Sequence, residues 1–207
     1  MSPGSSRNTL PGVLWCFARA DSITPGPTNI LVLSNSARYG FKAALPIIFG
    51  ACASAALVVM LAGSGLGQAL KAHPVIETSM LWVGTVWLSY LAWQIFRLPP
   101  DLIDPQSPSD SPQLGFWGAA GLQWINPKTW MMALAVVGVF SRNGAEKTLQ
   151  VMHLSLVFFS VSLPCAGAWA VLGARSGRLL RSPAAQTYFN RGMSVLLLCA
   201  VWLPVTV

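Results

Sequence analysis

The sequence predicts an all-α integral membrane protein in which six transmembrane helices form a 3+3 inverted repeat, with broken helices 1 and 4. Of its 207 residues, 54% are hydrophobic and 9% are charged, against roughly 25% charged in ordinary soluble domains. Apolar stretches suited to crossing a bilayer, which takes about 20 residues, recur along the chain. Three lie on each side of a proline-rich stretch. We therefore expect a single membrane transport domain over residues 1–207.

The first half of the chain, residues 10–96, contains three predicted spans: 10–36, 41–70 and 75–96. The first is apolar apart from two charges and a Pro-Gly-Pro cluster. The second is rich in small residues, and Gly50 and Ser54, four positions apart, allow another helix to approach closely in lipid. The third carries four aromatic residues suited to interfacial anchoring or helix packing: Trp82, Trp87, Tyr90 and Trp93.

A linker is predicted over 97–113. This stretch (RLPPDLIDPQSPSDSPQ) holds five prolines and three acidic residues, and it cannot form a regular helix or bury a core. The second half, residues 114–205, contains three further spans: 114–140, 149–172 and 188–205. An odd number of spans in each half makes the halves insert in opposite orientations, so the expected repeat is inverted.

Most of the basic residues lie between apolar spans, and they give the chain a formal charge of +7. This distribution suits membrane topology and anionic headgroups better than nucleic acid, which needs a solvated basic face. With both termini outside, the cytoplasmic side holds Arg38, Lys42, Arg97, Arg175, Arg178, Arg181 and Arg191. The opposite side holds Arg7, Lys71, Arg142 and Lys147. The positive-inside rule favours this orientation.

Helix 1 is predicted to break at Thr24-Pro25-Gly26-Pro27. Each proline removes a backbone donor, and Gly26 would allow conformations closed to other residues. Freed backbone is tolerated at membrane depth only where protein buries it or a wet cavity lines it. Carbonyls and amides at the break suit the ammonium and carboxylate of an amino acid, with Thr24 and Asn29 adding side-chain hydrogen bonds. The alternative is a packing kink without a ligand.

Helix 4 is predicted to break at Asn126-Pro127-Lys128. A lysine at the centre of a span costs roughly 2.5 to 3.5 kcal/mol on insertion scales. Lys128 either binds a carboxylate inside the bundle, pairs with Asp21, or snorkels to the headgroups if the span begins near Asn126. Asp21 is also a candidate proton carrier, since a desolvated carboxyl takes up protons more readily. Alternatively, Asp21 marks the membrane interface together with Arg19.

The sequence contains no motif typical of an enzyme, a metal site or a cofactor site. A nucleophile elbow, an H-E-x-x-H pair and paired carboxylates are all missing. The cysteines are far apart in apolar segments, without a C-x-x-C or a histidine at metal spacing: Cys16, Cys52, Cys165 and Cys199. We expect neither an enzyme nor a cofactor or metal site.

Two stretches, DSITPGPTNILVLSNSARYGFKAALPIIFG and QWINPKTW, carry a family resemblance. The first resembles the opening of the LysE/RhtB amino-acid exporter family, with its Pro-Gly-Pro in span one, and the second resembles that family's Asn-Pro-Lys motif in span four. TPGPTNILVLS and the Trp-rich third span are most similar to the cysteine and O-acetylserine exporter branch. Many members place an acidic residue just after the glycine of span two, whereas this chain has Gly50-Ala51-Cys52.

The resemblance implies a multi-pass exporter of the cytoplasmic (inner) membrane that expels amino acids or close derivatives and is driven by the proton gradient. Its functional positions are Pro25, Gly26 and Pro27 in span one, and Asn126, Pro127 and Lys128 in span four. We expect alternating access around a small amino-acid-like substrate held between the two breaks. The alternatives are a non-transporting membrane scaffold or assembly protein, and a channel. Small-residue pairs also suit a homo-oligomer.

Overall fold

The computed structural model describes residues 26–99, 114–141, 146–180 and 182–206, and the regular structure in this part is helical. The elements are α2 (Pro27–Tyr39), α3 (Phe41–Leu61), the π-helical turn η1 (Ala62–Leu66), α4 (Gly67–Ala72), α5 (Pro74–Arg97), α6 (Phe116–Ile125), α7 (Pro127–Phe140), α8 (Lys147–Leu179) and α9 (Pro183–Thr206). Thr24, Pro25, Asp21 and most of the predicted linker lie outside the described residues.

Three stretches of the described chain are long and apolar enough to cross a membrane: Phe41–Leu66, Pro74–Arg97 and Lys147–Gly177. A shorter apolar helix, α7, adds to them. The predicted span 114–140 consists of two short helices on either side of Asn126, which confirms the break in helix 4. The all-helical class is confirmed in the part that the structure describes, whereas the count of six spans stays a prediction.

The predicted boundaries need correction at three spans. Span 41–70 bends at Gly65, whose φ of 115° is open to glycine but rarely to other residues, and α4 continues beyond the bend. Span 149–172 belongs to α8, which has 33 residues and ends at Leu179. Span 188–205 belongs to α9, which begins with Pro183 in its first turn. Hydropathy marks the apolar part of a helix, and these helices continue into polar sequence at their ends.

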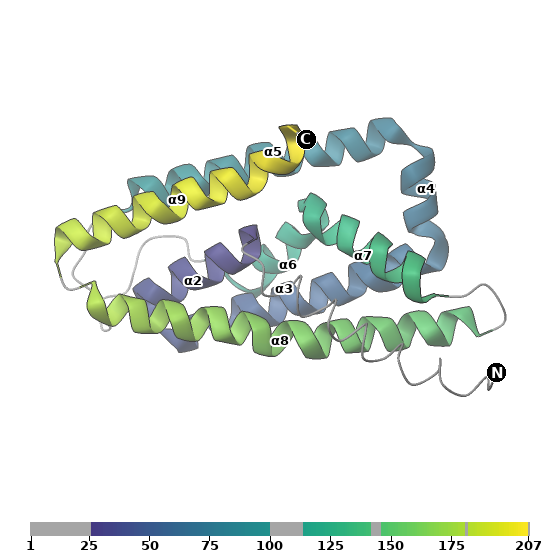
Figure 1. Cartoon of the computed structure of the whole chain (residues 1–207), viewed down its shortest axis with the longest axis horizontal. Coiled ribbons are helices and arrows are strands. Elements are labelled where there is room, and N and C mark those ends of the chain that lie inside the picture. Colours follow the sequence, from purple (N-terminus) through teal and green to yellow (C-terminus); the bar gives the residue numbers. More distant parts are fainter. Residues whose placement is uncertain (1–25, 100–113, 142–145, 181, 207) are drawn as a thin grey trace, which may run out of the picture.

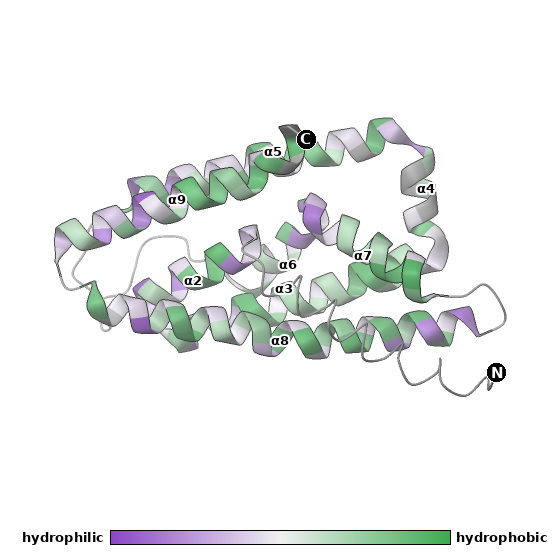
Figure 2. Ribbon diagram, in the orientation of Figure 1, coloured by the Kyte–Doolittle hydropathy of each residue, from purple (hydrophilic) through white to green (hydrophobic). Residues whose placement is uncertain are grey.

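The helices pack mainly between the two halves of the chain (Figure 1). The main contacts pair α2 with α8, α3 with α6, α3 with α8, and α5 with α9. In Figure 2 the helices are largely hydrophobic, whereas the start of α7 is hydrophilic and lies in the middle of the molecule. A polar helix start in that place needs partners inside the protein.

Small residues allow the closest of these contacts. Ser54 Oγ on α3 donates a hydrogen bond of 2.8 Å to the Ala120 carbonyl on α6. A Cβ atom at Gly50, one turn earlier, would collide with the backbone carbonyl of Phe116. The predicted close approach at Gly50 and Ser54 is therefore confirmed. Gly173 on α8 meets α2 in the same way, because a Cβ atom there would collide with the Leu33 carbonyl.

Candidate functional site

The first break precedes α2, which starts inside the protein. Gly26 has extended backbone (φ −136°, ψ 170°), the conformation favoured before a proline. Pro27 takes the first helical position, where a missing N–H is tolerated because it would have no helical partner. The Gly26 carbonyl accepts the first helical hydrogen bond, from Ile30 N at 3.0 Å. Pro27 and Asn29 are buried, so the amides at this helix start face protein interior.

The second break separates α6 from α7 at Asn126, which is only 3% exposed. Its backbone is extended (φ −84°, ψ 109°), and Pro127 occupies the first position of α7. Asn126 Oδ1 accepts a hydrogen bond of 3.2 Å from Lys128 N, and therefore caps α7. Trp130 Nε1 donates across the break to the Trp124 carbonyl at 2.8 Å. The second break is thus held by its own side chains.

The side chain of Lys128 lies over Gly26, which brings the two breaks together. A Cβ atom placed on Gly26 would be 3.0 Å from Lys128 Nζ and 3.3 Å from its Cδ. The glycine therefore provides the room that the lysine side chain occupies. The ammonium group lies beside the start of α2, within the helical bundle. Of the positions predicted for Lys128, the one inside the bundle agrees with this placement.

A polar bridge joins α2, α6 and α7 beside the breaks. Gln123 Nε2 donates a hydrogen bond of 2.9 Å to Thr28 Oγ1. Gln123 Oε1 accepts one of 2.7 Å from Thr129 Oγ1. Gln123 is 3% exposed and Thr129 is 9% exposed. The amide of Gln123 thus links the first broken helix to both segments of the second.

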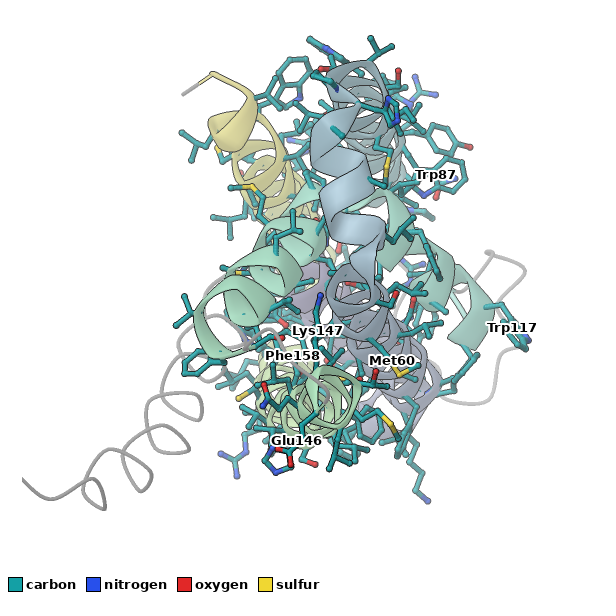
Figure 3. All side chains as sticks on the ribbon, turned by 90° about the vertical axis from the view of Figure 1, so that its right-hand side faces the viewer. Met60, Trp87, Trp117, Glu146, Lys147 and Phe158 are labelled. Carbon is teal, nitrogen blue, oxygen red and sulfur yellow. The ribbon has the colours of Figure 1, made fainter. Side chains whose placement is uncertain are left out.

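A cavity of about 80 Å³ lies between these elements. Its polar lining comes from both breaks and from α8: Thr28, Asn29, Gln123, Asn126, Lys128, Thr129 and Ser162. Its apolar wall is Ala51, Cys52 and Ala55 of α3, with Phe158 and Ala166 of α8. Figure 3 shows Phe158 pointing from α8 into the bundle. Among the lining residues that the structure describes, Lys128 supplies a cation and none is acidic. The cavity is therefore suited to a small molecule with a carboxylate.

The structure brings most of the predicted site residues together. Gly26, Pro27, Asn29, Asn126 and Lys128 line one cavity. Pro127 lies at the start of α7, and its ring is turned toward Gly84 of α5. In the described part of the chain, no group of three or more His, Cys, Asp or Glu side chains is arranged to hold a metal ion.

Four polar residues of the cavity were not predicted: Thr28, Gln123, Thr129 and Ser162. A usable signal was present for two of them. Gln123 and Thr129 stand three residues before and three residues after Asn126, in an otherwise apolar stretch. Polar side chains in a transmembrane segment usually find a hydrogen-bond partner in a neighbouring helix.

Comparison with known proteins gives matches along nearly the whole chain. The cysteine/O-acetylserine efflux protein of Salmonella paratyphi A is 28% identical over 191 residues, 91% of each chain. The protein of the same name from Escherichia coli K12 is 26% identical over 195 residues, 93% of this chain and 96% of that protein. No solved structure matches. The LysE type translocator family matches residues 20–202. The resemblance carried by the two break motifs is therefore confirmed, and the chain belongs to the LysE type translocator family.

Proposed function

We propose that this protein exports a small amino acid or a close derivative across the cytoplasmic membrane. The observation that carries the proposal is the meeting of both break motifs at one cavity, with the Lys128 side chain lying over Gly26. Family membership and relatives named for efflux of cysteine and O-acetylserine support the same activity. They also make a translocator a better explanation of the cavity than an enzyme.

The proposed substrate binds through its two charged groups. Its carboxylate faces the ammonium group of Lys128 and the start of α2, because helix N-termini carry partial positive charge. Its ammonium faces side-chain and backbone oxygens around the cavity, including Ser162 on α8. Small wall residues such as Ala51 and Ala55 leave space for a short side chain. Breaks of this kind place the required donors and acceptors at membrane depth.

Alternating access is the proposed transport cycle. In one contact, α2 in the first span of the first half packs against α8 in the second span of the second half. In the other, α3 in the second span of the first half packs against α6 in the first span of the second half. The last helices of the two halves, α5 and α9, pack against each other. Such reciprocal pairing supports an inverted repeat formed by residues 10–96 and 114–205 within one membrane domain, whose halves rock around a fixed site.

Proton coupling through Asp21 belongs to the same proposal. Ala51 and Cys52 occupy the positions after the Gly50 of span two, so the cavity wall on α3 offers no carboxyl there. Asp21, five residues before Gly26 in the sequence, is the nearest acidic residue to the first break. A carboxyl that is protonated on one side of the membrane and ionised on the other can couple substrate export to proton entry.

Uptake into inverted membrane vesicles tests the export activity. We expect O-acetylserine to accumulate when a proton gradient is imposed, and accumulation to fall at least tenfold in Lys128→Ala. Lys42→Ala, which changes an exposed lysine at the start of α3, serves as the matched control and should transport normally. Quantitative immunoblotting of the vesicles is used to check that all variants insert to the same level.

Two results would contradict parts of the proposal. If neither O-acetylserine nor any labelled amino acid accumulates despite normal insertion, the membrane-scaffold alternative is favoured. If accumulation persists after a proton uncoupler is added, or is unchanged in Asp21→Asn, coupling through that residue is wrong while export stands.

A further inference from the structure

A second and larger cavity lies between α2 and α5. Its volume is about 700 Å³, and it shares no lining residue with the cavity at the breaks. The backbone of α2 packs mainly against α8 and α3, whereas α2 and α5 meet through side chains in a buried cluster that includes Leu31 and Leu91. Ile47 of α3 and the residues around the start of α6, Leu114, Gly115 and Gly118, also line it. A cavity of this volume far exceeds the needs of a small amino acid.

The lining of this cavity is polar at one end and apolar at the other. Arg38 and Arg97, in the last turns of α2 and α5, mark the polar end. Leu31 and Trp87 lie deeper, seven and ten residues earlier in the same helices. At 1.5 Å per residue these separations are about 10 and about 15 Å. One leaflet contributes about 15 Å of hydrocarbon, so the cavity has the depth of a single leaflet.

The arginine end is built to hold an anion. The guanidinium carbon of Arg97 lies 4.4 Å from the centre of the Trp93 ring, a cation–π contact that fixes the group at the rim. Arg38 Nη1 donates to the Pro99 carbonyl at 3.4 Å, which places the second guanidinium at the same end. Guanidinium groups bind phosphate oxygens through paired hydrogen bonds.

Asn35 lies one turn below Arg38 on α2 and also lines the cavity. Its Oδ1 atom is buried and has no hydrogen-bond partner within the described part of the chain. A buried acceptor without a partner is costly, and such groups usually meet a ligand or water. If the Asn35 side chain turns toward the cavity that it lines, a hydroxyl group below the two arginines can supply the missing donor.

The aromatic side of the cavity faces outward. Trp87 and Tyr90 line it and are 46% and 51% exposed. Figure 3 shows Trp87 pointing away from the body of the bundle on the side of α5 opposite α9. Because α5 is long and apolar enough to span the membrane, its exposed side chains face lipid. A lipid molecule can therefore enter the cavity from the bilayer without crossing the protein.

We propose that this cavity binds an anionic phospholipid of the phosphatidylglycerol type. Its phosphate pairs with Arg97, beside the positive charge of Arg38, a headgroup hydroxyl donates to Asn35 Oδ1, and an acyl chain extends toward Leu31 and Trp87. The bound lipid fills the space between α2 and α5. It thereby supports α2, whose other end forms the first break.

Native mass spectrometry of the intact protein in detergent tests this proposal. With added phosphatidylglycerol or phosphatidylcholine, we expect phosphatidylglycerol to bind about tenfold more tightly. Arg97→Gln should reduce this preference, because the variant loses an exposed positive charge that favours the net-anionic headgroup of phosphatidylglycerol over the zwitterionic headgroup of phosphatidylcholine. Asn35→Leu, of similar volume, should weaken phosphatidylglycerol binding severalfold. Arg175→Gln is the matched control, because it changes an exposed arginine of α8 that does not line the cavity.

The proposal is overturned if both lipids bind equally well to the wild type. It is also overturned if Arg175→Gln weakens binding as much as Arg97→Gln, because that result indicates unspecific attraction to the basic surface. Displacement of the lipid by millimolar O-acetylserine would show instead that the cavity is an entrance for substrate. Size-exclusion profiles and melting temperatures are used to check that each variant is folded. If Arg97→Gln fails to fold, lipid binding by Asn35→Leu tests the proposal independently.

Discussion

The two breaks share one backbone arrangement and differ in what fills the space beside it. In both, an extended residue precedes a proline at the first position of a helix. Asn126 uses its side chain to cap the helix that follows. Gly26 has no side chain, and Lys128 occupies the place that a side chain would take. At the residue before the proline, the second break therefore has a polar side chain, whereas the first leaves space beside which the Lys128 side chain lies.

The two breaks also differ in the contacts that neighbouring residues make with them. The second break is braced by the Trp130–Trp124 hydrogen bond and by α5, where a Cβ atom at Gly84 would collide with the Ile125 carbonyl. The first break is joined to the second through Thr28 and Gln123. A transporter in which one break is fixed and the other moves would need this combination. The comparison predicts that substitutions at the first break disturb transport more than stability.

The largest effect is expected from Gly26→Val. The backbone at Gly26 is open to valine, so the damage should come from the displaced Lys128 side chain. We expect vesicle uptake to be lost while the protein still inserts, with Gly26→Ala giving an intermediate rate. Gly121→Val is the matched control, since nothing lies within 4 Å of a Cβ atom at Gly121. If Gly26→Val takes up substrate at the wild-type rate, transport does not depend on the space between Gly26 and the Lys128 side chain.

A smaller effect is expected from Gln123→Leu. This substitution keeps most of the volume and removes both hydrogen bonds of the polar bridge. Leaving buried hydroxyls without partners costs about 1–3 kcal/mol, and 1.4 kcal/mol corresponds to about tenfold in an equilibrium. We therefore expect uptake to fall about tenfold. Unchanged uptake together with an unchanged melting temperature would mean that the bridge does not couple the two breaks.

The smallest effect is expected from Asn126→Ala, and it concerns stability. Loss of a helix-capping side chain costs about 1 kcal/mol, which should lower the melting temperature by a few degrees. Asn126→Ser keeps a neutral acceptor for Lys128 N and should restore most of the lost stability. If alanine and serine at position 126 melt alike, the side-chain cap is not a stabilising feature of α7.

Local chemistry explains which features could be predicted from the sequence. Proline acts on its own helix and on the residue before it, so the break at Asn126 was predictable without a fold. The close helix contact at Gly50 and Ser54 followed from residue size. The bend could not be assigned to Gly65 from the sequence, because the glycine-rich run Gly63–Gly67 suits close helix packing as well as a helix end.

The partners within the site could not be predicted, because they are distant in the chain. Gln123 and Thr28 are 95 residues apart, and no local pattern connects them. The position of Lys128 was open for the same reason: a lysine near the start of a span either snorkels or turns inward. The fold distinguishes these two positions, because it places Gly26 next to the Lys128 side chain inside the bundle.

Chemical modification of Cys52 would test the central claim most directly, because this thiol lies on the wall of the cavity between the two breaks. In a variant whose other cysteines, Cys16, Cys165 and Cys199, are replaced by serine, the rate of reaction with a small methanethiosulfonate reagent is measured with and without O-acetylserine. We predict that O-acetylserine slows the reaction, and that Lys128→Ala removes this protection. A rate that O-acetylserine leaves unchanged, in a variant that still transports it, would contradict binding at the meeting point of the two breaks.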